Sequence, residues 1–246
     1  MKPSGLQGTV HLATYEDVER EMQQVVRTEF HEADFFRTLA AGGYSGAQIR
    51  HFAIQYSFYS RNFPRVLGAS IAAMAPMDSW WVPLADNLWD EAGRGQPGKS
   101  HEQLYKTFLL SVDPKLFLND LGMPEDGVSP AVDQAIFTFL EFFRNASPLE
   151  AMAAVGLGSE VFAGDVMGTI ARGLRHPSYN LESKLDLLFW DVHADEHEPR
   201  HYQLCKDILI QFTSQSDLQT MFEVGRSIAK SEAKMYQELH NEMVRL

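Results

Sequence analysis

The sequence predicts an all-α protein, a single domain spanning residues 1–246 and built as a bundle of seven to nine helices. Apolar residues recur at helical spacing in almost every segment, and alternating β-branched runs are scarce. Hydrophobic residues make up 45 % of the 246-residue chain, which is enough for one large core. No obvious linker or short-period repeat divides the chain.

The first half contains signals for five helices. We expect them at 15–29, 32–41, 45–74, 78–92 and 100–111, with Thr14, Ser45 and Ser100 as N-terminal caps and Gly42 and Gly43 ending the second. Pro64 lies deep inside the third helix, where it removes a backbone donor and is expected to produce a kink. Residues 93–98 and 113–128 are expected to be loops.

The second half is predicted to contain four more helical segments. Ser147 and Pro148 form a cap and first turn, so we expect helices over 130–145 and 148–174. A loop follows at 176–180. A histidine-bearing helix then starts near Leu181 and reaches Pro199, and Ser216 opens a last helix of about 30 residues.

The net charge of −12 excludes one large class of partners. The chain has 21 basic and 33 acidic residues, and nucleic-acid binding depends on basic patches. No apolar stretch approaches the length of a membrane span, and the first residues lack the apolar core of a secretory signal. The single cysteine, Cys205, cannot form an internal disulfide and is expected to be structural. We therefore expect a soluble cytoplasmic protein.

Glu160 is the only charged residue in the apolar run 151–163. A buried carboxylate costs several kcal/mol unless it is paired, protonated or bound to a metal. The neighbouring Gly156, Gly158 and Ala163 are small, which suits close helix packing or a cavity. Glu160 is thus either a metal ligand or a carboxylate hydrogen-bonded to a buried tyrosine or arginine.

Three histidines recur every four residues, at His193, His197 and His201. This spacing places them near one face of a helix, and imidazoles at i and i+4 can bind one metal ion. The alternative is a core histidine at 193 with exposed histidines at 197 and 201. Pro199 could turn His201 toward the other two or away from them.

Glu91 and His101 flank the glycine-rich loop 93–98, so two helix ends could converge on one ion. The alternative is a solvated Glu91 at a helix end and a His101 that helps to cap the next helix. Tyr59 belongs to an aromatic stripe with Tyr56 and Phe63. Such stripes are usually core, although Tyr59 could line a ligand cavity.

In their order, these residues resemble the TenA/PqqC-like superfamily with the haem-oxygenase-like fold, and most closely the haem-oxygenase-like di-iron oxidases, which include CADD-type proteins. The similar segments are Phe30-His31, Gly42-Gly43, Gln55-Tyr-Ser-Phe-Tyr59, Asn87-Leu-Trp-Asp-Glu91-Ala-Gly93, His101, Gly156-Leu-Gly-Ser-Glu160 and Phe189-Trp-Asp-Val-His193. The resemblance implies a compact helical bundle, often a homodimer, with metal held between helices. It implies ligand roles for Glu91, His101, Glu160 and His193.

The sequence departs from the family after His193. Where the family usually has His-x-x-x-Asp-x-x-His, this chain has His197 in place of the aspartate and Arg200 in place of the second histidine, with His201 one residue later. His197 could replace the carboxylate as a ligand. The site could also bind one metal, another metal or none, and an arginine directed into it would repel a cation. Arg200 could instead contact an anionic substrate.

The function expected from these residues and the resemblance is a non-haem iron oxidase or oxygenase. It would hold one or two iron ions and use dioxygen as co-substrate on a small organic molecule. One alternative is a metal-free PqqC-like oxidase or a small-molecule-binding protein with a degenerate metal site. A second alternative is an interaction protein, which would have a packed core and a conspicuous exposed apolar patch.

Overall fold

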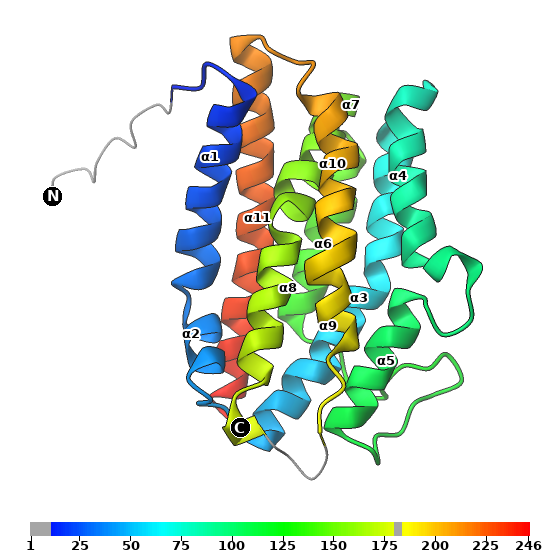
Figure 1. The fold of residues 1–246 in the computed structure, drawn as a ribbon, viewed down its shortest axis with the longest axis vertical. Coiled ribbons are helices and arrows are strands. Elements are labelled where there is room, and N and C mark those ends of the chain that lie inside the picture. Colours follow the sequence, from blue (N-terminus) through cyan, green and yellow to red (C-terminus); the bar gives the residue numbers. More distant parts are fainter. Residues whose placement is uncertain (1–10, 180–183) are drawn as a thin grey trace, which may run out of the picture.

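The computed structural model describes residues 11–179 and 184–246, apart from the side chains of residues 196–198. Regular structure in these ranges is helical, with one isolated bridge between Leu118 and Pro124 (Figure 1). The α-helical segments are α1 (Tyr15–Val26), α2 (Asp34–Ala40), α3 (Gly46–Ala73), α4 (Asp78–Glu91), α5 (His101–Val112), α6 (Pro130–Phe143), α7 (Pro148–Val155), α8 (Val161–Leu174), α9 (Leu188–Val192), α10 (Glu198–Leu209) and α11 (Gln215–Met243).

Three π-helical turns are built into this framework: η1 (Arg27–His31), η3 (Gly156–Glu160) and η5 (His193–His197). Two of them join α-segments without a break, because η3 connects α7 to α8 and η5 connects α9 to α10. The eleven α-segments therefore form nine helices within the described ranges, in agreement with the predicted all-α bundle. Short 3₁₀ turns follow α4 and α8, as η2 (Gly93–Gly95) and η4 (Pro177–Tyr179).

The predicted N-terminal caps are confirmed where the side chain accepts a backbone hydrogen bond from the first turn. Each of these residues does so: Thr14, Ser45, Ser100 and Ser147. The last helix begins earlier than predicted, because the side chain of Ser214, not that of Ser216, accepts a hydrogen bond from the Asp217 amide.

The start of the histidine-bearing helix was predicted wrongly. Residues 184–187 are not helical, and the helix begins at Leu188, whose amide donates to the side chain of Asp186. The predicted start at Leu181 lies outside the described residues. Because the helix starts later, His193 lies in its second turn, close to the end that approaches α5.

The long helices run along the long axis of the molecule, with α11 beside α1 and α10 in front of the core (Figure 1). α11 packs against α1, α6, α7 and η3, whereas α3 packs against α4, α5 and α6. Two glycines permit the close approach of α11 to η3. A Cβ added at Gly158 would lie 2.7 Å from Ile228 Cβ, and one at Gly225 would lie 2.7 Å from Leu157 Cβ.

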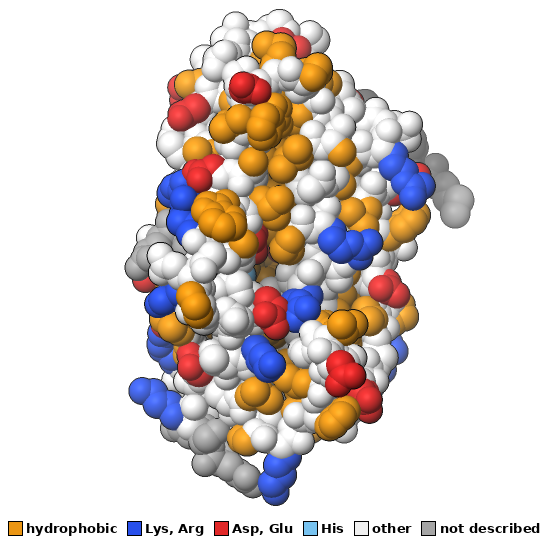
Figure 2. All heavy atoms as spheres, turned by 90° about the vertical axis from the view of Figure 1, so that its right-hand side faces the viewer, with side chains coloured by type: hydrophobic (Ala, Val, Ile, Leu, Met, Phe, Trp, Pro, Cys, Tyr) orange, Lys and Arg blue, Asp and Glu red, His pale blue; other side chains and the backbone are white. Residues whose placement is uncertain are grey.

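The face formed by α4 and α5 carries apolar side chains over its upper half and charged side chains below (Figure 2). Large apolar side chains are exposed in this region: Met77, which precedes α4, and Val82 and Trp89 of α4 have exposed fractions of 54 %, 45 % and 50 %. Within the described residues, each helix is too short or too polar to cross a membrane.

Candidate metal centre

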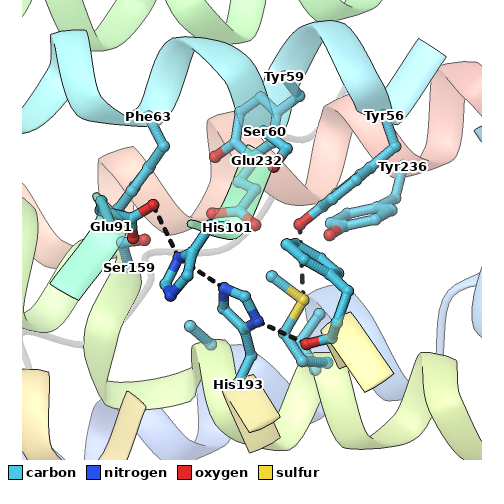
Figure 3. Close-up of a pocket in the computed structure, with 14 residues that line it drawn as sticks. Tyr56, Tyr59, Ser60, Phe63, Glu91, His101, Ser159, His193, Glu232 and Tyr236 are labelled. Carbon is cyan, nitrogen blue, oxygen red and sulfur yellow. Dashed lines mark hydrogen bonds and ion pairs between the residues drawn. The ribbon is translucent and has the colours of Figure 1, made fainter. Parts of the chain in front are cut away.

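Three predicted ligands from three separate helices meet in the interior. Glu91 ends α4, His101 begins α5, and His193 opens the π-turn between α9 and α10. His101 Nδ1 lies 2.8 Å from Glu91 Oε2 and 2.9 Å from His193 Nε2 (Figure 3). One ligand atom from each residue lies within 4.8 Å of the others, and all three side chains are buried. This geometry can hold one metal ion.

The orientation of His193 is fixed by the helix that carries it. Its Nδ1 lies 2.5 Å from the carbonyl oxygen of Phe189 and donates a hydrogen bond to it. A neutral imidazole with its proton on Nδ1 has a free electron pair on Nε2, which is the atom that faces His101. A backbone carbonyl that fixes the ring in this way is typical of metal-binding histidines.

Glu160, the fourth ligand implied by the resemblance, is not among the described residues whose ligand atoms lie within 4.8 Å of one another. Its side chain is inaccessible to solvent, and Oε1 accepts a hydrogen bond of 2.7 Å from the Asn87 amide. Oε2 makes no hydrogen bond to a described residue and lies 3.8 Å from His201 Nδ1. Among the described residues, no tyrosine or arginine forms a hydrogen bond or ion pair with Glu160. A buried carboxylate that receives only a neutral amide is poorly compensated, which suits a ligand position for a cation.

His201 is fully buried, so the exposed position considered from the sequence is wrong. The π-turn η5 explains why His201, the eighth residue after His193, reaches the interior. In an unbroken α-helix, the seventh residue after His193 would return to the same face. The wider turn η5 takes up one additional residue, and the eighth residue, His201, takes that position instead. Burial lowers the pKa of His201, while the charges of Glu160 and Glu91 raise it.

Arg200 lies against α4 rather than in the cavity. It forms ion pairs with Asp86 and Asp90 of α4, and Arg94 also binds both aspartates. Asp90 in turn lies 3.2 Å from His201 Nε2. The predicted substrate-binding residue Arg200 is therefore absent from the cavity lining. Its charge is compensated by Asp86 and Asp90.

A cavity of about 40 Å³ adjoins the Glu91, His101 and His193 cluster. Tyr59, the other predicted substrate contact, lines this cavity. Most of the remaining lining is apolar or aromatic, from α3, α8, α9 and α11: Tyr56, Phe63, Ala163, Val166, Met167, Phe189 and Tyr236. The cavity is therefore a mainly apolar space next to a cluster of metal-type donors. The side chain of the predicted ligand His197 lies outside the described residues.

Sequence reasoning missed one acid in this cavity, Glu232 of α11. Its position was visible in the sequence, because it follows Ala229 by three residues on the inner stripe of the last helix. Burial, reinforced by the charge of Glu160, raises the pKa of Glu232 to about 8, while a contact from Tyr59 opposes this shift. Glu232 is thus a second buried carboxyl close to the centre.

The raised pKa of Glu232 predicts a measurable dependence of stability on pH. Between its ordinary value of 4.5 and the folded value of about 8, the folded protein binds more protons than the unfolded chain, so stability falls as pH rises. Relative to Glu232→Gln, the metal-free wild type is expected to lose roughly 2–3 kcal/mol of unfolding free energy between pH 5.5 and 7.5. Urea unfolding at both pH values measures this. If the wild type and Glu232→Gln differ in unfolding free energy by the same amount at both pH values, the prediction is contradicted.

The donors fit iron. Imidazole nitrogens and carboxylate oxygens are the ligands of non-haem iron, and thiolates select other metals. The only thiol is that of Cys205, and burial raises its pKa well above its usual value, so it stays protonated. The Glu91, His101 and His193 cluster supplies one carboxylate and two imidazoles. These residues form a nitrogen- and oxygen-rich site for a divalent cation.

Comparison with known proteins agrees with this chemistry. A family model described as "Iron-containing redox enzyme" matches residues 50–229, which include Glu91, His101, Glu160 and His193. No curated protein matches the chain.

Solved structures show the same fold at low sequence identity. A CADD-like protein of unknown function from Nostoc punctiforme is similar with a TM-score of 0.74 and 16 % identity, over 94 % of this chain and 98 % of that one. A domain of unknown function with a heme oxygenase-like fold from Shewanella denitrificans gives 0.71 and 13 %, over 92 % of each chain. A TenA homologue from Pyrococcus furiosus gives 0.64 and 13 %, over 91 % and 98 %.

Proposed function

The chain belongs to the family of iron-containing redox enzymes, and from this premise we propose that it is a non-haem iron oxidase or oxygenase acting on a small organic substrate with dioxygen. The observation that carries the proposal is the convergence of Glu91, His101 and His193 from three helices in a buried position. Glu160 would supply a further carboxylate to the bound metal.

The side chains around the centre support this chemistry. The bound iron would supply the electrons that activate dioxygen. The aromatic rings of Phe63 and Phe189 exclude bulk water from the space beside the ligands, which protects a reactive centre from side reactions. Asp90 accepts a hydrogen bond from His201 Nε2, so that the other ring nitrogen, Nδ1, faces Glu160.

Elemental analysis tests the proposal. Protein purified without chelator from iron-replete cells, or loaded with ferrous iron under anaerobic conditions, is expected to contain at least one iron per chain. Admission of dioxygen should then consume oxygen in proportion to the bound ferrous iron. A wild-type protein that binds no iron under these conditions would exclude the iron-dependent oxidase and leave the metal-free alternatives, a PqqC-like oxidase or a small-molecule-binding protein.

We expect substitutions of the predicted ligand His197 to change the affinity of the site for iron. A neutral imidazole in place of a carboxylate leaves more positive charge on the site, so His197→Asp is expected to increase the iron content. His197→Ala should weaken iron binding by at least about tenfold. Both effects are measured by iron analysis after dialysis against graded chelator. An unchanged iron content in His197→Ala would show that His197 is not a ligand.

A further inference from the structure

We propose that Glu232, Tyr59 and Tyr236 form the binding subsite for the ammonium group of a primary amine substrate. The inference deepens the proposed function, on which it rests, because it assigns a substrate class to the cavity beside the metal ligands. The three residues come from α3 and α11, and Figure 3 shows them turned toward the same space.

Three buried oxygens in this subsite lack hydrogen bonds of normal geometry to any described residue: Tyr59 Oη, Glu232 Oε2 and Tyr236 Oη. Their residues are only 6 %, 7 % and 0 % exposed, so bulk water does not satisfy them. Each unsatisfied buried polar atom costs about 1–3 kcal/mol. Such atoms in one cavity indicate a place where a polar ligand group is bound.

The charges around the cavity favour a cationic ligand group. The described residues that line it include no lysine or arginine, and the basic side chains among them, His101 and His193, face Glu91 and each other. A ligand carboxylate would therefore find no protein cation here. Glu232 offers a counter-ion to an ammonium group, and the tyrosine hydroxyls offer oxygen acceptors for its N–H groups.

The aromatic walls favour the same choice. Tyr56, Tyr59, Phe63 and Tyr236 line the cavity, and ring faces attract a desolvated cation. Burial raises the pKa of Glu232 to about 8, so this carboxyl lies where a positive partner would stabilise its charged form. An entering ammonium group would supply that partner and favour the carboxylate.

The size of the cavity limits the amine. A volume of about 40 Å³ is well below the ~150 Å³ of a cavity that holds benzene, so only the head of a substrate fits without movement of side chains. A primary ammonium group with its first carbon fits this space, whereas a quaternary ammonium does not. Met167, a flexible side chain in the wall, can move to accommodate more of the substrate.

Calorimetric titration with matched probes tests the inference. The full chain, loaded with ferrous iron without dioxygen, is titrated with ethylamine, ethanol and acetate. Ethylamine and ethanol have the same size, so the comparison isolates the charge. We expect ethylamine to bind at least tenfold more tightly than ethanol. We expect Glu232→Gln to abolish this preference and Glu238→Gln, an exposed position on the same helix, to keep it.

Equal affinity for ethylamine and ethanol would overturn the inference, as would an amine preference that survives in Glu232→Gln. Acetate binding that is tighter than amine binding and is lost in Glu232→Gln would also overturn it, by making Glu232 a donor to anions. Tyr59→Phe, which should weaken the amine preference, replaces Glu232→Gln if that variant does not fold. Failure of the proposed function gives a different result, namely that the chain binds no iron. In that case the same titration of the iron-free chain still measures the preference for ethylamine over ethanol.

Discussion

Replacement of Glu160 by glutamine is expected to weaken iron binding by more than about 100-fold, beyond the 10–100-fold that loss of an outer partner costs. The substitution keeps the shape of the side chain and an oxygen for the Asn87 amide, and removes only the charge. Without iron, the variant is expected to be more stable than the wild type, because the wild type buries a carboxylate compensated mainly by a neutral amide.

Two measurements check this prediction: iron content after dialysis against graded chelator, and urea unfolding of the metal-free proteins. Glu141→Gln is the control, since Glu141 is an exposed acid on α6 that pairs with Arg144. It should match the wild type in both measurements. Iron content in Glu160→Gln equal to that of the control would remove Glu160 from the ligand set.

Replacement of Gly158 by valine is expected to destabilise the protein by about 3 kcal/mol. The new Cβ would lie 2.7 Å from both Ile228 Cβ and Ile228 Cγ2, so α11 and the turn η3 must separate. Glu160 belongs to the same turn, and its displacement should lower the iron content as well. Chemical unfolding and iron analysis of the same preparation measure the two effects.

Gly68→Val provides the matched control for this substitution. Gly68 lies on the exposed face of α3, and a Cβ there would meet no atom within 4 Å. Valine also has a higher helix propensity than glycine, so Gly68→Val should stay within about 0.5 kcal/mol of the wild type. Equal stability of Gly158→Val and Gly68→Val would show that the close approach of α11 to η3 does not depend on Gly158.

The bundle could be predicted from the sequence because its signals are local. Capping residues such as Ser45 and Ser147 bind the first turn of their own helix, and the inner stripe of α11 follows from its apolar period. The π-turns could not be predicted in the same way. Each depends on packing between distant segments, such as Gly158 against Ile228, and tertiary contacts decide which residues widen a helical turn.

Candidate site residues could be predicted from the sequence where a single polar residue stands in an apolar run. Glu160 is of this kind, and so is His193, which continues the stripe of Phe189. Asp90 and Asn87 were missed, although they lie three residues apart on one face of α4, because their roles require partners from α10 and η3. Arg200 shows the opposite error. Its positive charge suggested a contact with an anionic substrate, but it forms ion pairs with Asp86 and Asp90 of α4.

The turn η5 allows the centre to accommodate a difference of one residue in the length of the chain. Its wider turn takes up the additional residue, so α10 keeps the rotation that an unbroken α-helix would give it. Loss of a single residue between His193 and His201 would let the turn narrow, and His201, then the seventh residue after His193, would keep its place beside Glu160. Loss of a second residue could not be absorbed in this way and would rotate α10 by about 100°, which would remove Arg200 from Asp86.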